Sequence, residues 1–367
     1  MKKKLSIKDI ARELNVSPTA VSFILNGKAE EKRISKEVVK KVEKFIQKTG
    51  YKPNSLARSL RTGKTNTIAL MIEDIANPFF ANIARLIEEK AYKSGYKIIY
   101  SSTDNDPVIA RELIQMYRER HVDGYIITPS EGIEEELNAL LEADLPVVLF
   151  DRYVPGVDCD VVLINNEQSA YKATRHLVEE GYRNIAFITL NSLQSQMQER
   201  LNGYEKALAE AGLPSRVKEL SYTSATHNND LIRYITAFLN RNKGLDAVLF
   251  GTNYIGVNGL KAIRTMGLAI PDDLAVVSFD DHDVFQLNSP DITAIAQPIE
   301  KIAEKLITVL LGKLTAGNKS KGLRKMELPA ELVVSHSSVK GSNADKKGQA
   351  AGEQGKKENP KQHAGDE

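Results

Sequence analysis

The sequence has a single cysteine, Cys159, among its 367 residues. One thiol cannot form an internal disulfide or supply a cysteine-based metal cluster, so both are excluded. No apolar run approaches the roughly 18 residues that suggest a membrane-spanning helix. The basic start "MKKKLSIKDIARELN" lacks the apolar stretch of a signal peptide. With 42% hydrophobic residues, the sequence predicts a soluble, cytoplasmic protein with sizeable cores and no membrane partner.

Catalytic motifs are missing as well. The sequence contains no G-x-S-x-G, no GxxxxGK[ST], no HExxH and no paired carboxylates in an evident acid–base setting. Its six histidines are scattered along the chain: His121, His176, His227, His282, His336 and His363. His282 lies between two aspartates, but without a further ligand nearby a loop or cleft-rim histidine is the better interpretation. We therefore expect no enzyme, no metal and no cofactor.

Charge is distributed unevenly. Residues 1–61 hold 16 Lys and Arg against 6 Asp and Glu, a net charge of +10, whereas residues 62–367 hold 34 against 42, a net charge of −8. Lysine-rich helix faces can be merely solvated. A basic head on an acidic body is nevertheless the asymmetry expected of a nucleic-acid-binding module joined to another domain.

The head reads as three short helices. Ser6 is a plausible N-cap with Asp9 three residues later, and Ser17-Pro18 begins a second helix after a tight turn. The segment "SKEVVKKVEKFIQKTG" supplies a third helix that ends at Gly50. The residues expected inside are Ile7, Ile10, Ala11, Leu14, Val21, Ile24, Leu25, Val38, Val39, Val42, Phe45 and Ile46. Thr19, Ser22 and Phe23 should point away from this core. Two short helices joined by a tight turn and closed by a third are typical of a helix-turn-helix.

The body alternates short apolar runs with helical segments. The predicted strands are 67–72, 96–101, 122–129, 145–152, 161–166, 184–190, 217–222, 245–252 and 274–281, and helices of 12 to 17 residues lie between most of them. This alternation favours βαβ units and parallel sheets. The series breaks near residue 163, which predicts two doubly wound subdomains with a cleft, and ligands bind such sheets beyond the carboxyl ends of the strands. Residues 341–367 are polar and should be disordered.

At this point the chain resembles the lactose-repressor (LacI/GalR) family of bacterial transcription regulators, from about Ser6 to Val339. The head "IKDIARELNVSPTAVSFILNG" is similar to that family's helix-turn-helix, and "GYKPNSLARSLRTGKT" is similar to its hinge. The body resembles its periplasmic-binding-protein-like effector domain through "NPFF", "HVDGYII", "VVLFDR", "GYRNIAFI", "RLNGYEKAL", "VVSFDD" and "AQP". The motifs occur in the family's order.

The resemblance implies a domain layout. The DNA-binding domain spans residues 1–52, and a hinge helix and linker span 53–66. The ligand-binding and dimerisation domain spans 67–340, followed by the tail 341–367. Within the body, we expect one subdomain at about 67–163 plus 292–324 and the other at about 164–291 plus 325–340.

In the head, the resemblance assigns DNA contacts to Ser6, Ser17, Pro18, Thr19, Ser22, Phe23 and Asn26. Two features depart from the family. Phe23 stands where a polar or basic residue is common; it can contact a thymine methyl or fold back onto the loop after Gly27. The segment "GKAEEKRIS" is about three residues longer than usual and carries Lys28, Lys32 and Arg33, either near phosphates or in water.

The hinge "PNSLARSL" is too short to be a stable helix alone. By resemblance it folds on DNA beside its twin from a second subunit. Leu60 would be the apolar wedge in the minor groove, Ala57 would permit close approach, and Arg58 and Ser59 would contact groove edges or phosphates. Such a wedge favours a pyrimidine–purine step at the operator centre. A plain linker is the alternative.

The resemblance places the effector-binding residues around the cleft: Phe79, Phe80, Asp151, Arg152, Arg200, Tyr222, Asn253, Asp280 and Gln297. Carboxylates and an arginine suit a polyol, whose hydroxyls both donate and accept, and an aromatic face covers its C–H side. Each residue could instead be an ordinary surface charge or strand-end cap, and purines also bind this fold.

Together these features predict a ligand-responsive, sequence-specific transcription regulator, most simply a repressor. It would bind a palindromic operator in double-stranded DNA as a homodimer under the control of a sugar or, with less support, a purine. The alternative is a cytoplasmic sugar- or purine-binding protein with no DNA-dependent role, which leaves the basic head unexplained.

Overall fold

The computed structural model describes residues 5–51, 63–221, 228–316 and 324–341. These residues belong to two compact units, Met1–Asn66 and Thr67–Glu367, which we call the head and the body. The hinge residues Ala57, Arg58, Ser59 and Leu60, the cleft residue Tyr222 and the tail beyond Gly341 lie outside the described residues. None of the described helices is long and apolar enough to span a bilayer.

The head is the predicted three-helix unit, built from α1 (Ile7–Leu14), α2 (Pro18–Leu25) and α3 (Lys36–Thr49). Each helix begins at a serine whose side chain accepts a backbone N–H; these serines are Ser6, Ser17 and Ser35. Ser6 also forms a capping box with Asp9. The small core contains Ile10, Ala11, Leu14, Val21, Ile24 and Val42, with the remaining predicted inner residues packed against it.

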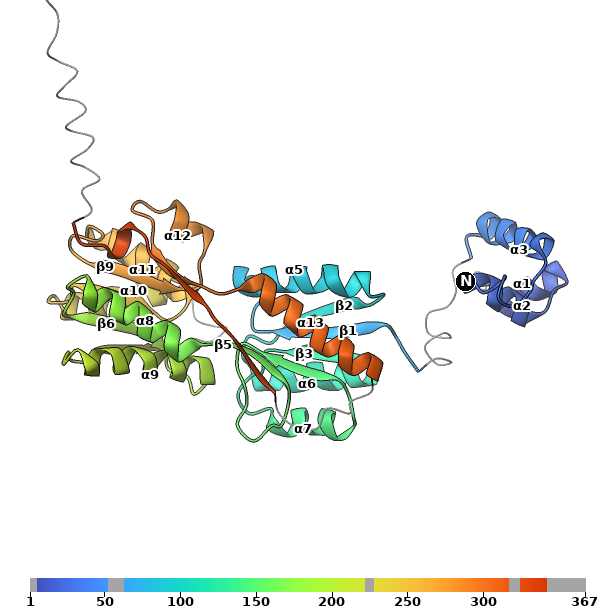
Figure 1. The fold of residues 1–367 in the computed structure, drawn as a ribbon, viewed down its shortest axis with the longest axis horizontal. Helices are drawn as coiled ribbons and strands as arrows, with labels where there is room; N and C mark the ends of the chain where they lie inside the picture. The colour runs from blue at the N-terminus through green and yellow to red at the C-terminus, as the bar shows by residue number, and fades with distance from the viewer. Residues whose placement is uncertain (1–4, 52–62, 222–227, 317–323, 342–367) are drawn as a thin grey trace, which may run out of the picture. The chain divides into compact units, whose positions relative to one another are not determined.

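The first subdomain of the body has a parallel sheet in the order β11-β5-β4-β3-β1-β2. Its strands are β1 (Thr67–Ile72), β2 (Lys97–Ser102), β3 (Gly124–Ile127), β4 (Val147–Phe150), β5 (Val161–Ile164) and β11 (Lys325–Leu328). The covering helices are α5 (Pro78–Lys93), α6 (Pro107–Glu119), α7 (Glu134–Glu142) and α13 (Ile299–Ala316). Helices α5 and α13 pack on one face of this sheet, and α6 and α7 pack on the other (Figure 1).

The second subdomain has the sheet order β12-β10-β9-β8-β6-β7, in which only β12 is antiparallel. Its strands are β6 (Ile185–Leu190), β7 (Val217–Leu220), β8 (Ala247–Phe250), β9 (Ala275–Phe279), β10 (Thr293–Ala296) and β12 (Glu331–Val333). Its helices are α8 (Asn166–Glu179), α9 (Ser195–Glu210), α10 (Asn228–Arg241), α11 (Asn253–Met266) and α12 (Asp283–Leu287), followed by a 3-10 turn at His336–Ser338. The first two cover one face, and α10 and α11 cover the other.

All nine predicted strands are present as β1 to β9, and the predicted break near residue 163 coincides with the end of β5, which pairs with β4. The expected division between the subdomains is wrong in two places. Strand β10 pairs with β9 and not with the first sheet, whereas β11 returns to pair with β5. The chain therefore passes between the sheets after β5, after β10 and after β11. Strands β10 and β11 have four residues each, too few for their own pattern to show which sheet they join.

Two glycines test how tightly helices pack on the sheets. A Cβ added at Gly259 of α11 would lie 2.1 Å from Phe250 Cζ of β8, whereas one added at Gly312 of α13 would meet no atom within 4 Å. We expect Gly259→Ala to destabilise the body by about 1–3 kcal/mol through overpacking. Gly312→Ala should instead stabilise it by about 0.5–1 kcal/mol, because it removes a glycine from a helix interior. Thermal unfolding of both variants checks this, and equal shifts would contradict it.

Candidate DNA-binding surface and effector cleft

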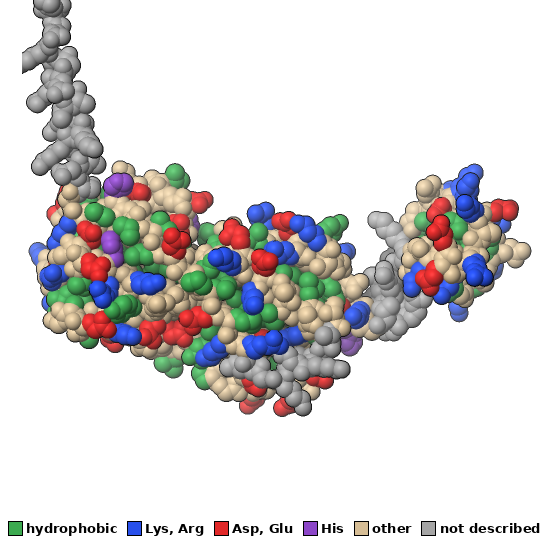
Figure 2. Space-filling model, viewed as in Figure 1, with side chains coloured by type: hydrophobic (Ala, Val, Ile, Leu, Met, Phe, Trp, Pro, Cys, Tyr) green, Lys and Arg blue, Asp and Glu red, His purple; other side chains and the backbone are tan. Residues whose placement is uncertain are grey.

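The head presents one side of α2 away from its core. Val21 and Ile24 are buried, whereas Ser17, Pro18, Thr19 and Asn26 are exposed and Ser22 and Phe23 are half-buried. At 100° per residue, Thr19, Phe23 and Asn26 lie together on the side opposite the core. In Figure 2 the visible face of the head carries Lys and Arg side chains beside a few carboxylates.

Some of the predicted DNA contacts already have partners within the head. The Ser6 hydroxyl accepts from the Asp9 N–H at 3.2 Å, and the Ser17 hydroxyl accepts from the Ala20 N–H at 3.1 Å. The Asn26 amide donates to the Ser22 carbonyl at 2.6 Å. These bonds fix the helix ends. Thr19 and Phe23 are therefore the predicted contacts on the outward side of α2 that take no part in capping a helix.

The cleft of the body is built on two aspartates that each follow a strand. Asp151 comes directly after β4 and Asp280 directly after β9, and both have left-handed backbone, with φ of 71° and 64°. This conformation is uncommon for residues other than glycine, although aspartate tolerates it better than most. One carboxylate comes from each sheet, at the edge where ligands bind in doubly wound folds.

Six of the predicted effector residues line one small cavity between the subdomains: Phe79, Phe80, Asp151, Arg200, Asp280 and Gln297. Its volume of about 30 Å³ is far below the 300–1,000 Å³ typical of ligand pockets. A ligand of sugar size would fit here only together with the adjoining cavities or after these side chains move apart. Asn253 lines two adjoining cavities, one of about 300 Å³, whereas Arg152 lines none of them.

Arg200 is the central cation of this cavity and is 2% exposed. Its Nε donates to Asn166 Oδ1 at 2.9 Å and its Nη1 donates to the Gly251 carbonyl at 2.7 Å. The guanidinium lies 4.0 Å from the centroid of the Phe279 ring, a favourable cation–π distance. These contacts hold the arginine in one orientation before any ligand binds.

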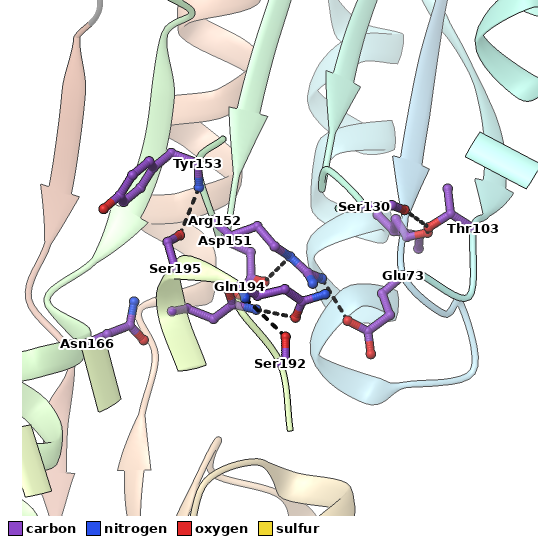
Figure 3. Close-up of polar contacts among 12 residues, drawn as sticks. Glu73, Thr103, Ser130, Asp151, Arg152, Tyr153, Asn166, Ser192, Gln194 and Ser195 are labelled. Carbon is purple, nitrogen blue, oxygen red and sulfur yellow. Dashed lines mark hydrogen bonds and ion pairs between the residues drawn. The ribbon is translucent and has the colours of Figure 1, made fainter. Parts of the chain in front are cut away.

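Arg152, which was predicted to bind the effector, lies behind the cavity wall. Its side chain is 2% exposed and its Nη2 donates to Glu73 Oε2 at 2.7 Å, while its Nε pairs with Asp151 at 3.2 Å (Figure 3). It therefore positions the Asp151 carboxylate. Burial nevertheless raises the pKa of Asp151 to about 6, with Arg152 and Arg200 opposing the shift.

Sequence reasoning missed several residues of the cleft. Gln194 and Gln196 lie at the start of α9 and are 8% and 3% exposed, and both line the cavity. The Gln196 amide N–H donates to Gln194 Oε1 at 3.1 Å, while the Gln196 Oε1 has no hydrogen-bond partner among the described residues. A buried acceptor without a partner is costly, so it suits a ligand that donates. In the sequence, Gln194 and Gln196 could have been found only because they lie four to six residues before Arg200, at the start of the same helix.

Hydrogen bonds also cross the cleft directly. Asn253 donates to Asn77 at 2.9 Å, and the Tyr153 N–H donates to Ser195 at 3.1 Å. On another part of the rim, Glu131 accepts from the Ser192 hydroxyl at 3.1 Å and from the Leu193 N–H at 3.0 Å. Each bond joins the two subdomains, so each must break if the cleft opens.

His282 belongs to the cleft rim and caps a helix there. Its Nδ1 accepts the Val284 N–H at 3.0 Å at the start of α12. Among the residues that the structure describes, no group of three His, Cys, Asp or Glu side chains could hold a metal ion. The loop interpretation of this histidine agrees with its geometry.

Comparisons with known proteins agree with both units. The model of bacterial regulatory proteins of the lacI family matches residues 6–54, and that of the periplasmic binding protein-like domain matches residues 174–338. The HTH-type transcriptional repressor PurR of Photobacterium profundum is 31% identical over 344 residues, covering 92% of this chain and 99% of the relative. The ribose operon repressor of Halalkalibacterium halodurans is 30% identical over 340 residues, covering 93% and 99%.

The fold is shared with solved structures. The transcription regulator CcpA of Lactococcus lactis superposes with a TM-score of 0.65 at 21% identity, covering 74% of this chain and 98% of that one. Its likeness supports the two-sheet architecture, while the full-length relatives support the combination of a helix-turn-helix head with an effector domain. The chain belongs to the lacI family of bacterial regulatory proteins and is a ligand-responsive, DNA-binding transcription regulator.

Proposed function

We propose that this regulator binds a palindromic operator as a homodimer and that its effector is a sugar or a sugar derivative. The observation that carries the effector class is the set of buried polar groups around one cavity. Asp151 and Asp280 accept, Arg200 donates, and Gln196 offers an acceptor that no described residue uses. A polyol satisfies such a mixture because each hydroxyl both donates and accepts.

The aromatic residues of the cavity wall, Phe79 and Phe80, can cover the C–H side of a sugar ring. The Phe279 ring is fully buried behind this wall, where the Arg200 guanidinium lies 4.0 Å from its centroid. Phe79 and Phe80 pack edge to face, with their centroids 5.0 Å apart. A ribose operon repressor among the relatives supports a sugar as the effector. Because PurR is also a relative, the binding experiment below includes purine bases.

Control of DNA binding follows from the cross-cleft bonds. An effector that holds the subdomains at a different separation changes the bonds of Asn77 with Asn253 and of Glu131 with the 192–193 segment. The difference in effector affinity between the two forms sets the coupling, typically about 1–3 kcal/mol. By resemblance, that shift decides whether paired hinges fold on DNA. The effector releases the protein from DNA or promotes its binding according to which of the two forms it prefers.

The first prediction concerns Asp280. Its Oδ1 accepts from Gln297 at 2.5 Å and its carboxylate lines the cavity. We expect Asp280→Asn to weaken effector binding at least about tenfold, since hydrogen bonds to charged groups contribute about 1.5–3 kcal/mol. DNA affinity without effector should be unchanged. Calorimetric titration with D-ribose, other free sugars and the purine bases measures this.

Asp230 of α10 is the matched control, because it pairs with Arg233 and lines none of the cavities of the cleft. Asp230→Asn should bind the effector as the unaltered protein does. An unchanged affinity in Asp280→Asn would move the site away from this cavity. Binding of purine bases but no sugar would overturn the proposed effector class.

The second prediction is a pH dependence of effector binding. Because burial raises the pKa of Asp151 to about 6, this carboxyl is ionised at pH 7.5 and gains a proton as the pH falls through 6. The neutral form is the weaker acceptor for effector hydroxyls, so affinity should fall between pH 7 and pH 5 by up to about tenfold per pH unit. Asp151→Asn should bind with a flat profile over this range. A flat profile in the unaltered protein would exclude Asp151 as an acceptor.

The third prediction tests the operator. Selection of duplexes from a random pool should enrich a palindrome with a central pyrimidine–purine step, and light scattering should give a mass near twice 40.7 kDa. Leu60→Ala should weaken binding to that palindrome at least about tenfold, because the wedge that kinks the duplex is lost, without changing effector affinity. Enrichment of single half-sites by a monomer would contradict the dimer, and equal operator affinity would contradict the wedge.

A further inference from the structure

The recognition helix has no cation of its own. Residues Pro18–Leu25 of α2 read PTAVSFIL, without a charged side chain. Its outward side offers Thr19, Phe23 and Asn26, and the Asn26 amide is bound to Ser22. Guanine is most often read in the major groove by Arg or Lys through its O6 and N7 acceptors. If this head reads guanine, the cation must come from outside the helix.

The long loop after α2 forms a defined structure against that helix. The Lys28 N–H donates to the Phe23 carbonyl at 2.9 Å, and the Lys32 N–H donates to the Lys28 carbonyl at 3.0 Å. The Ile34 N–H donates to the Ala29 carbonyl at 2.9 Å, and both of these side chains pack against the core of the head. The loop is therefore anchored at both ends by backbone hydrogen bonds and by the packing of Ala29 and Ile34.

The two departures from the family pattern contact each other in this structure. The Lys32 Nζ lies 5.7 Å from the centroid of the Phe23 ring, within the range of a cation–π contact. The Lys32 side chain remains 42% exposed, and its only ion pair among the described residues is with the exposed Glu31, at 2.8 Å. The ring is half-buried and lies on the same side of α2 as Thr19.

We propose that Lys32, held over the ring of Phe23, is the residue that reads guanine in the major groove for this head. Phe23 then acts as a positioning residue that supports the lysine stem, and it makes no polar base contact itself. On DNA the ammonium exchanges the Glu31 carboxylate for the guanine O6 and N7 acceptors. This inference rests on the proposed palindromic operator and adds the residue that specifies one base pair in each half-site.

The test repeats the duplex selection with the full-length protein and matched variants. Lys32→Met keeps the length of the stem and removes the charge, and Lys28→Met makes the same change at an exposed lysine of the same loop. We expect the unaltered protein to prefer guanine at one position of each half-site by about tenfold, the order of a good base contact. Lys32→Met should lose that preference, whereas Lys28→Met should keep it.

Two substitutions at Phe23 test the support. Phe23→Tyr keeps the ring and should retain the preference, whereas Phe23→Leu keeps an apolar side chain without the ring and should lose most of it. Circular dichroism confirms that the head is folded in each variant. A preference that survives Phe23→Leu would overturn the positioning role.

The outcomes separate this inference from the proposed function. If the unaltered protein enriches no palindrome, the proposed operator fails. If it enriches one without a guanine that depends on Lys32, only the present inference fails. Equal weakening of all duplexes by Lys32→Met would show a phosphate contact, and unchanged binding would show a solvated lysine; both results overturn the base-reading role.

Discussion

Charge buried between the two sheets is the constraint on which the body depends. Asp151, Arg152 and Arg200 are almost fully enclosed where the subdomains meet, and an unpaired charge in such a place is strongly destabilising. Each therefore has a specific partner: Arg152 binds Glu73 and Asp151, and Arg200 binds the Gly251 carbonyl and stacks on Phe279. These partners come from strand ends and loops of both sheets. Any change in subdomain separation consequently changes the solvation of charged groups, which makes the cleft responsive to a polar ligand.

The pairing is not complete, and two of the incompletely satisfied groups, Asp151 and Gln196, line the small cavity. The raised pKa of Asp151 shows that its arginine partners do not fully offset the cost of burial. Gln196 adds an acceptor without a partner in the described part of the chain. A ligand that donates hydrogen bonds to these groups would therefore gain more binding free energy than it would from the same contacts at an exposed surface. In a buried site, water does not compete for these hydrogen bonds. The Asp151 carboxylate and the Gln196 Oε1 both lie on the cavity wall. The free-energy cost of leaving them unsatisfied without a ligand would therefore favour effectors that donate hydrogen bonds to them.

The parts of this molecule that local chemistry determines could be predicted from the sequence. Ser6, Ser17 and Gly50 marked helix ends because caps act within a few residues. The resemblance to the family assigned Asp151 and Asp280 to the cleft, in agreement with the rule that ligands bind beyond strand ends, and both line one cavity. Gln194 and Gln196 were missed, because nothing in their local sequence shows that the start of α9 meets the other sheet. The placement of β10 and β11 failed for the same reason, since pairing of a four-residue strand is decided by its neighbours in space.

The head and the body use charge in opposite ways, and this difference separates their tasks. In the body, charges such as Arg200 are enclosed and oriented before binding, so they discriminate between ligands by geometry and are little affected by salt. In the head, lysines such as Lys28 and Lys36 are exposed and suit phosphates of any sequence, an interaction that weakens steeply as salt rises. A helix without charge, flanked by exposed lysines, would bind DNA with little discrimination for guanine. The Phe23–Lys32 contact is the one place in the described head where a cation is held by an aromatic ring next to the outward side of α2, so it is there that affinity can become sequence specificity.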